Sequence, residues 1–224
     1  MKNKMFRVSF KIILIITFIL IYTSTVFAFS AISTDNSNSI NETYWAHDCI
    51  VSLLRAQIIT GYDDGSIKPE NNITREEVAV MIAKALVYKN LNIKLLPVDY
   101  KSIYKDRISN WALEYVNLIT YNNVFFGYPD NTFKAKNNIT REEAAKVIAI
   151  AFNKPLSNDY ELNFADNGNI SDWSLPYVKT LVKVNILKGY SDNTFKPLNE
   201  ITRAEFFSIM CNELELHDQK MDDK

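Results

Sequence analysis

The chain has 224 residues, in which 25 lysines and arginines stand against 26 aspartates and glutamates, so its formal net charge is −1. A chain this close to neutrality has no general attraction for nucleic acid or anionic surfaces, and any anion that it binds has to be captured at a local site. Only two histidines and two cysteines are present. None of them has a credible catalytic partner in the sequence, which disfavours an enzyme.

Residues 1–28 have the pattern of a secretory signal peptide. Four basic residues precede an apolar run from Ile12 to Tyr22, and Val26-Phe27-Ala28 has the small-x-small pattern of a cleavage site. The apolar run has about half of the ~20 residues needed to span a bilayer, which disfavours a retained membrane anchor. Residues 29–40 are rich in Ser and Asn and predict a flexible leader. We therefore expect a secreted protein without membrane contact after cleavage.

A heptapeptide, Asn-Asn-Ile-Thr-Arg-Glu-Glu, occurs at residues 71–77 and again at 137–143, and a looser copy spans 199–205. In each copy a Thr stands three residues before a Glu, which is the spacing of a capping box at the start of a helix. The predicted capping pairs are Thr74 with Glu77, Thr140 with Glu143, and Thr202 with Glu205. Three copies indicate a repeat protein.

Two further landmarks recur in register with the heptapeptide. A Trp is followed 16 residues later by a Gly and, 13 residues after that, by the capping Thr; these are Trp45, Trp111 and Trp173 with Gly61, Gly127 and Gly189. Apolar residues at helical intervals follow each Trp and each Thr, so each repeat should form a helix, a turn-rich loop begun by the Gly that ends this helix, and a second helix. Ser109 and Ser171 are candidate caps of first helices. The predicted fold is all-α, with repeats at 41–88, 104–153 and 164–214 sharing a core and a polar tail at 215–224.

Arg75, Arg141 and Arg203 each occupy the first helical position, where a cation opposes the helix dipole. A guanidinium beside free amide groups at a helix start would form an anion site. The alternative is that each Arg pairs with a neighbouring Glu and only restores the charge balance. From the residues alone, both readings stay open.

Other candidate sites are weaker. Cys49 and Cys211 lie on apolar helix faces, which favours two buried thiols over a disulfide between them. The Asp-containing turns lack the ligand spacing of a calcium loop, so no metal site is expected. Adjacent carboxylates such as Glu142 and Glu143 point in different directions on a helix and do not face each other across a substrate. We predict neither a catalytic residue nor a cofactor.

The combined motifs resemble the S-layer homology (SLH) domain of bacterial surface proteins. They are Trp-Ala at Trp45 and Trp111, the loop Gly-Tyr-x-Asp-Asn-Thr-Phe-Lys at 127–134 and 189–196, and Ile-Thr-Arg-x-Glu. The resemblance covers residues 41–214. It implies a pseudo-threefold assembly of three repeats that binds secondary cell-wall polysaccharide, often through a pyruvate ketal, and holds a protein at the cell wall or S-layer. Other functions to be weighed are a wall-associated protein-binding scaffold and a non-catalytic part of a polysaccharide-degrading surface system, with S-layer proteins or surface enzymes as partners.

The resemblance also suggests the ligand-binding residues. The family's motif arginine lies in grooves between adjacent repeats, which maps onto Arg75, Arg141 and Arg203, with the motif carboxylates Glu77, Glu143 and Glu205 beside them. Trp45, Trp111 and Trp173 present apolar planes that suit sugar rings, although core packing is the alternative, and Tyr62, Tyr128 and Tyr190 have the same ambiguity. Because the motif is least complete in the first repeat, we expect Arg75 to contribute least to binding.

Overall fold

The computed structural model describes residues 40–216. The predicted signal peptide, residues 29–39 of the predicted leader and residues 217–224 of the predicted tail lie outside the described residues. The described chain divides into two compact units, one made of residues 40–41 and 60–67 and the other of 42–59 and 68–216. Each is described by itself.

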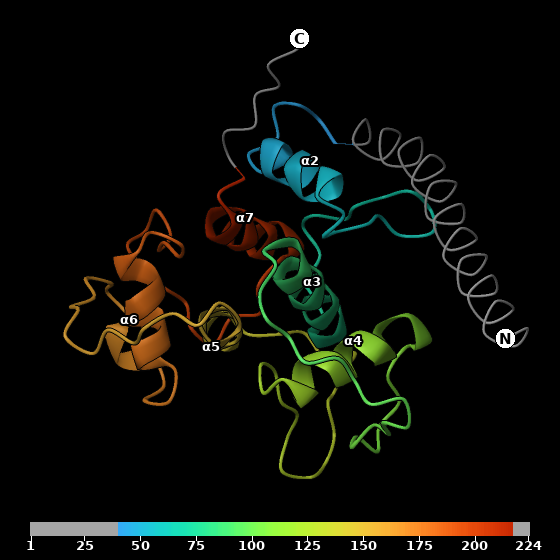
Figure 1. Cartoon of the computed structure of the whole chain (residues 1–224). Coiled ribbons are helices and arrows are strands. Elements are labelled where there is room, and N and C mark those ends of the chain that lie inside the picture. The colour runs from blue at the N-terminus through green and yellow to red at the C-terminus, as the bar shows by residue number, and fades with distance from the viewer. Residues whose placement is uncertain (1–39, 217–224) are drawn as a thin grey trace, which may run out of the picture. The chain divides into compact units, whose positions relative to one another are not determined.

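The larger unit is built from six α-helices (Figure 1). They are α2 (His47–Arg55), α3 (Arg75–Tyr88), α4 (Asn110–Tyr121), α5 (Arg141–Ala151), α6 (Leu175–Lys183) and α7 (Arg203–Leu214), with one 3₁₀ turn, η1 (Asn167–Asn169). Between residues 40 and 216 only isolated β-bridges form, without a strand or sheet. This confirms the predicted all-α fold class. No helix in this part of the chain is long and apolar enough to cross a membrane.

Capping boxes start the second helix of every repeat, as predicted. Thr74, Thr140 and Thr202 are the N-cap residues of α3, α5 and α7, and each side chain accepts a hydrogen bond from the amide of the Glu three residues later. In return, each of these Glu side chains accepts a hydrogen bond from the amide of its Thr. Such a cap contributes about 1 kcal/mol to helix stability, so the three together help to fix where the helices begin.

The three segments before these helices meet around a pseudo-threefold axis. The amide of Ile73 donates to the carbonyl of Ile201, that of Ile201 to Ile139, and that of Ile139 back to Ile73, over 3.0, 3.1 and 3.1 Å. All three isoleucine side chains are fully buried. Because each segment donates to one neighbour and accepts from the other, no repeat can complete this ring of hydrogen bonds alone.

Helix packing closes the same ring. The second helix of each repeat packs against the first helix of the next repeat: α3 against α4, α5 against α6, and α7 against α2 (Figure 1). The larger unit is therefore a cyclic arrangement in which the main helix contacts lie between repeats, which explains why the repeats share one core.

A Gly follows each Trp at the same spacing, and the structure gives a reason for it other than the predicted helix end. The first helices end earlier, and the left-handed residues that follow them are Gln57, Asn123 and Asn185, not Gly. Gly127 and Gly189 lie further on, in the loops, where a Cβ atom would collide with a backbone carbonyl and an aromatic ring. For Gly127 these are the carbonyl of Thr132 and the ring of Tyr104. Glycine is needed there because of close approach, not helix termination.

The caps of the first helices also differ from the prediction. Ser109 is the N-cap residue of α4, but its hydroxyl makes no cap hydrogen bond and donates to Glu76 Oε1 at 3.0 Å. Ser174, not Ser171, is the N-cap residue of α6. The hydroxyls of both these serines donate to Glu142 at 2.8 Å. Buried glutamates on the second helices thus hold the start of the first helix of the next repeat.

An Asp ahead of the first helix fixes the loop of its own repeat. Asp166 accepts hydrogen bonds from the amides of Phe195 and Lys196, both at 2.7 Å, and Asp106 holds Phe133 and Lys134 in the same way. We expect Asp166→Ala to lower the free energy of unfolding by about 1–3 kcal/mol, because two amides lose a charged acceptor. Urea unfolding would measure this change.

Asp159→Ala is the matched control for that substitution. Asp159 is exposed and its only recorded ion pair within residues 40–216 is a 3.7 Å contact with Lys183. Its removal should change stability by less than about 0.5 kcal/mol. Equal effects of the two substitutions would show that the loop does not depend on Asp166.

A buried carboxylate near the end of α7 makes stability depend on pH. Burial raises the pKa of Glu213, although Lys154 Nζ lies 2.9 Å from its Oε1. Folding therefore disfavours the ionised form of Glu213. Its contribution to the free energy of unfolding is fully present below its ordinary pKa of 4.5 and is lost as the pH rises through the raised value. Glu213→Gln should flatten the dependence of the free energy of unfolding on pH above 4.5, measured by urea unfolding at several pH values. The exposed Glu114→Gln should leave that dependence as it is, and an unchanged slope in Glu213→Gln would contradict the assignment.

The two cysteines are paired, contrary to the expectation of two buried thiols. A disulfide joins Cys49 of α2 to Cys211 of α7, with Cα atoms 5.8 Å apart. It links the first repeat to the third, at the point where the cyclic arrangement closes. Facing apolar positions on two helices that pack together bring the thiols within reach, although 162 positions separate them in sequence.

Candidate functional site

The three motif arginines are buried, with exposed fractions of 3% for Arg75, 6% for Arg141 and 5% for Arg203. The sequence had suggested free amide groups beside these arginines at the helix starts, but these amides are hydrogen-bonded. The amides of these three residues donate to the carbonyls of Asn137, Asn199 and Asn71 of a neighbouring repeat, over 2.8 to 2.9 Å. The next amide along each helix also donates to a carbonyl of that repeat. These helix starts therefore do not offer the anion site that was expected from backbone amides.

Arg75 is held by the loop of the second repeat. Its Nε donates to the carbonyl of Phe133 and a terminal nitrogen to the carbonyl of Phe126, both at 2.9 Å. The guanidinium carbon lies 4.5 Å from the ring centre of Phe125 and 4.8 Å from that of Tyr128. Such planar stacking with forked hydrogen bonding suits Arg rather than Lys.

Arg141 and Arg203 use related contacts with different partners. Arg141 donates to the carbonyl of Lys188 and lies over the ring of Tyr190 at 4.6 Å, while its Nε has no hydrogen-bond partner within residues 40–216. Arg203 pairs with Glu77 at 2.7 Å and lies over the ring of Phe207 at 5.1 Å. Each arginine thus lies in an aromatic environment.

The motif carboxylates join the helix cap to the arginine. Glu143 caps α5 with one oxygen, and its other oxygen lies 3.5 Å from Arg75 and accepts from the hydroxyl of Tyr128 at 3.3 Å. Glu205 accepts from the hydroxyl of Tyr190 at 2.7 Å. The resulting clusters of Arg, Tyr and Glu bring most of the predicted site residues together.

Burial dominates the electrostatics of these clusters. It lowers the pKa of Arg75 and of Arg141, and their tyrosine and glutamate neighbours partly offset this effect. Burial also raises the pKa of Tyr128 and raises that of Tyr190 to about 12, so both hydroxyls stay protonated and donate to carboxylates. Arg75 and Arg141 remain charged because the ordinary pKa of an arginine is far above neutrality.

The tryptophans are exposed, so the core-packing alternative does not describe them. Their exposed fractions are 61% for Trp45, 53% for Trp111 and 45% for Trp173. Tyr62 lies in the smaller unit, where its amide donates to the carbonyl of Ser66 and its carbonyl accepts from Gly65, both at 2.8 Å.

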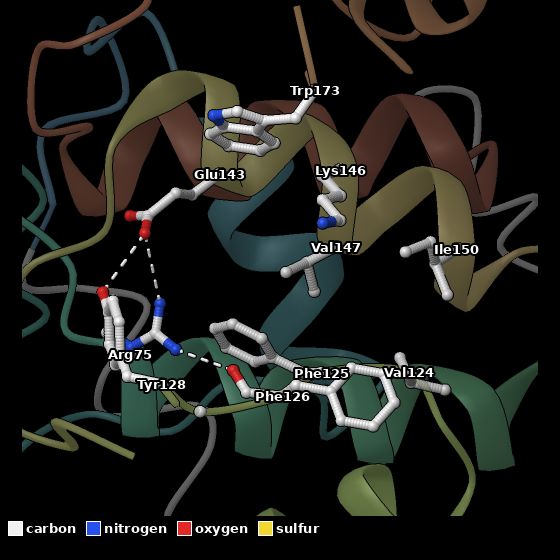
Figure 2. Close-up of a pocket in the computed structure, with 11 residues that line it drawn as sticks. Arg75, Val124, Phe125, Phe126, Tyr128, Glu143, Lys146, Val147, Ile150 and Trp173 are labelled. Atoms are coloured by element: carbon white, nitrogen blue, oxygen red, sulfur yellow. Dashed lines mark hydrogen bonds and ion pairs between the residues drawn. The ribbon is translucent and has the colours of Figure 1, made fainter. Parts of the chain in front are cut away.

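A pocket of about 210 Å³ lies beside the Arg75 cluster (Figure 2). Its wall combines Arg75 of the first repeat, the loop 124–128 and the α5 side chains of the second, and Trp173 of the third. The α5 side chains that line it are Glu143, Lys146, Val147 and Ile150. The pocket thus draws on all three repeats, and it has an apolar surface with two cations and a carboxylate.

Sequence reasoning missed Lys146 and Phe126 as site residues. Lys146 Nζ lies 5.1 Å from the ring centre of Trp173 and 5.9 Å from that of Tyr177. Phe126 contributes a carbonyl to Arg75, and its side chain is 50% exposed at the pocket. Neither residue type repeats, since Lys146 corresponds to Val80 in α3 and Ser208 in α7, and Phe126 corresponds to Thr60 and Lys188. A search for repeated motifs could not find them.

The match of the chain to a known family follows the same three repeats. A sequence profile of the S-layer homology domain matches residues 41–79, 103–145 and 163–207, which together are more than half of the chain. The chain belongs to the S-layer homology domain family. The motifs by which the sequence resembled SLH domains are therefore family motifs, and they supply the ring of Ile residues, the capping boxes and the buried arginines.

Relatives with SLH repeats are larger proteins. A cellulosome-anchoring protein of Acetivibrio thermocellus is 37% identical over 166 residues, covering 71% of this chain and 36% of that protein. Cell surface glycoprotein 1 of the same organism is 33% identical over 165 residues, covering 70% of this chain and 7% of the glycoprotein. A surface-layer 125 kDa protein of Lysinibacillus sphaericus is 27% identical over 174 residues, covering 76% of this chain and 14% of the relative. The chain thus spans about a third of the first relative and a small part of the other two.

The motif arginine of one SLH repeat contacts the neighbouring repeat. Arg75 belongs to the first repeat, yet its loop partners come from the second, whose Gly-Tyr-Pro-Asp-Asn-Thr-Phe-Lys motif is complete. Incomplete motif residues in the first repeat therefore do not weaken the surroundings of Arg75. The expectation that Arg75 contributes least was based on the loop of the first repeat, and it stays a prediction.

Proposed function

We propose that this chain is a non-catalytic anchoring module that binds secondary cell-wall polysaccharide in grooves between its SLH repeats and so holds a protein at the bacterial cell surface. The pocket beside Arg75 carries the proposal, because it combines an exposed indole, apolar walls and positive charge at a junction of repeats. The similarity of the chain to a cellulosome-anchoring protein and to a surface-layer protein supports the same function.

The groove suits a sugar with a carboxylate substituent, such as a pyruvate ketal. The exposed face of Trp173 can cover the C–H side of a pyranose ring, and the pocket cations provide the charge that a carboxylate needs. Because the whole chain is near neutral, this local charge has to provide the selectivity. The corresponding residues of the other two grooves are proposed to be Arg141, Tyr190, Glu205 and Trp45 in one, and Arg203, Glu77 and Trp111 in the other.

The absence of a catalytic role is part of the proposal. Glu76 is 1% exposed and contacts Ser109 and Lys136, and Glu142 is held by Ser171 and Ser174. Glu143 already caps α5. These carboxylates are committed to helix starts and neighbouring repeats, which argues against acid and base roles in glycan hydrolysis.

Sedimentation with purified cell-wall sacculi tests the proposal. The protein should pellet with native sacculi and remain in solution after mild acid has removed the pyruvate ketals. Binding that survives complete depyruvylation would contradict the carboxylate mechanism while leaving wall binding in place. No binding to native sacculi would refute the anchoring function itself.

A further inference from the structure

The two cations of this pocket, Arg75 and Lys146, differ in how many of their hydrogen-bond donors are already engaged. The Arg75 guanidinium is buried, donates to two backbone carbonyls, faces Glu143 and lies against aromatic rings. A ligand carboxylate would have to displace Glu143 or a loop carbonyl to reach it. Displacing a buried hydrogen-bond partner costs free energy that a ligand would have to replace.

Lys146 is in the opposite situation. In Figure 2 its side chain projects from α5 into the space between Trp173 and the side chains of Phe125 and Phe126. Its recorded partners among residues 40–216 are the rings of Trp173 and Tyr177, without a carboxylate or carbonyl. An ammonium group has three donors, and ring contacts leave them available.

We propose that Lys146 donates directly to the carboxylate of the bound sugar, while Arg75 is a positioning residue that holds the loop 124–128 in place. This inference rests on the proposed function of the groove and identifies which cation contacts the ligand. The ligand class is a pyranose bearing a carboxylate, stacked on Trp173 so that its anionic group reaches Nζ. The other two grooves cannot form the same lysine contact from this helix position, because it holds Val80 and Ser208 in the other repeats.

The aromatic frame explains why a lysine is suited to this position. Trp173 and Tyr177 hold the ammonium by cation–π attraction without neutralising it, so the charge is oriented but still free to pair. Val147 and Ile150 keep one side of the pocket apolar. A carboxylate that enters this largely apolar pocket gains more from the ammonium than it would on an open surface.

The test uses the full chain with two probes, native sacculi and the 4,6-O-pyruvate ketal of a methyl mannoside. Lys146→Gln should weaken binding of the ketal in this groove at least about tenfold, because a charge-assisted hydrogen bond is lost. Binding to sacculi should weaken by a smaller factor, because the two other proposed grooves keep their contacts. Lys146→Arg should stay within about threefold of the original chain, since it keeps the charge. Lys183→Gln removes one exposed positive charge on α6 outside the pocket and should leave binding unchanged.

Tryptophan emission supplies a readout that folding alone would not move. In a Trp45→Phe, Trp111→Phe background only Trp173 emits, and the ketal probe should change its emission with a midpoint that Lys146→Gln shifts by the same factor. If the original chain binds sacculi and Lys146→Gln leaves the midpoint of the Trp173 emission change with the ketal probe unaltered, the assignment to Lys146 is wrong and wall anchoring stands. If the original chain does not bind sacculi, both proposals fail. If the ketal and methyl glucuronide bind equally, Lys146 recognises a carboxylate without preference for the ketal.

Discussion

Arg75→Ala is expected to lower the free energy of unfolding by about 3–5 kcal/mol, the range for removing one partner from a buried charged pair. The guanidinium is 3% exposed and bridges the first repeat to the loop of the second. Its removal leaves the carbonyls of Phe126 and Phe133 without this donor and opens a space beside the ring of Phe125. Urea unfolding followed by circular dichroism would measure the loss.

Arg75→Lys separates charge from geometry. The ammonium keeps the positive charge but cannot form the fork that reaches two carbonyls while stacking on a ring, so we expect it to recover less than half of the lost stability. Lys183→Ala, which removes an exposed cation on α6, should change stability by less than about 0.5 kcal/mol. If Arg75→Ala unfolds at the same urea concentration as the original chain yet loses wall binding, Arg75 is a ligand contact, and its assignment as a positioning residue is wrong.

Local features were predictable because their causes are local. A Thr three residues before a Glu satisfies amides of its own helix, and this spacing located the starts of α3, α5 and α7 correctly. The all-α class followed from apolar residues at helical intervals. These inferences needed no knowledge of which repeat packs against which.

Features that depend on tertiary contacts, within a repeat or between repeats, were not predictable in the same way. The spacing of Gly127 suggested a helix end, but the side chain and carbonyl that exclude a Cβ belong to Tyr104 and Thr132. The arginine at a helix start suggested free amides, but a neighbouring repeat supplies carbonyls to those amides. The sequence gives each repeat's residues in order, whereas the cyclic packing decides that Arg75 meets the loop of the second repeat.

The cysteines show the same limitation at longer range. Cys49 and Cys211 each stand on an apolar helix face, which is equally compatible with a buried thiol and with a disulfide. The pairing of the first helix with the last decides between them, and this contact follows from ring closure rather than from any local pattern.

Removing the Cys49–Cys211 disulfide should have the largest effect on stability that we expect from any single bond. The bond spans 162 positions, and the chain-entropy relation for a loop of that length gives about 5 kcal/mol. The double variant Cys49→Ala, Cys211→Ala should therefore unfold at a much lower guanidinium concentration, and adding a reducing agent to the original chain should produce a similar shift. Alanine is preferred to serine because both sites are buried and a hydroxyl there would need a partner.

The reducing agent also provides the internal control. It should leave the unfolding midpoint of the double variant unchanged, since no disulfide remains to be reduced. If it also leaves the midpoint of the oxidised original chain unchanged, the disulfide does not stabilise the fold, and the hydrogen-bonded ring of Ile73, Ile139 and Ile201 closes the repeats without it. A large shift would mean that the packing of α2 against α7 depends on a covalent bond, whereas α3 with α4 and α5 with α6 are held by non-covalent contacts between repeats that are adjacent in sequence.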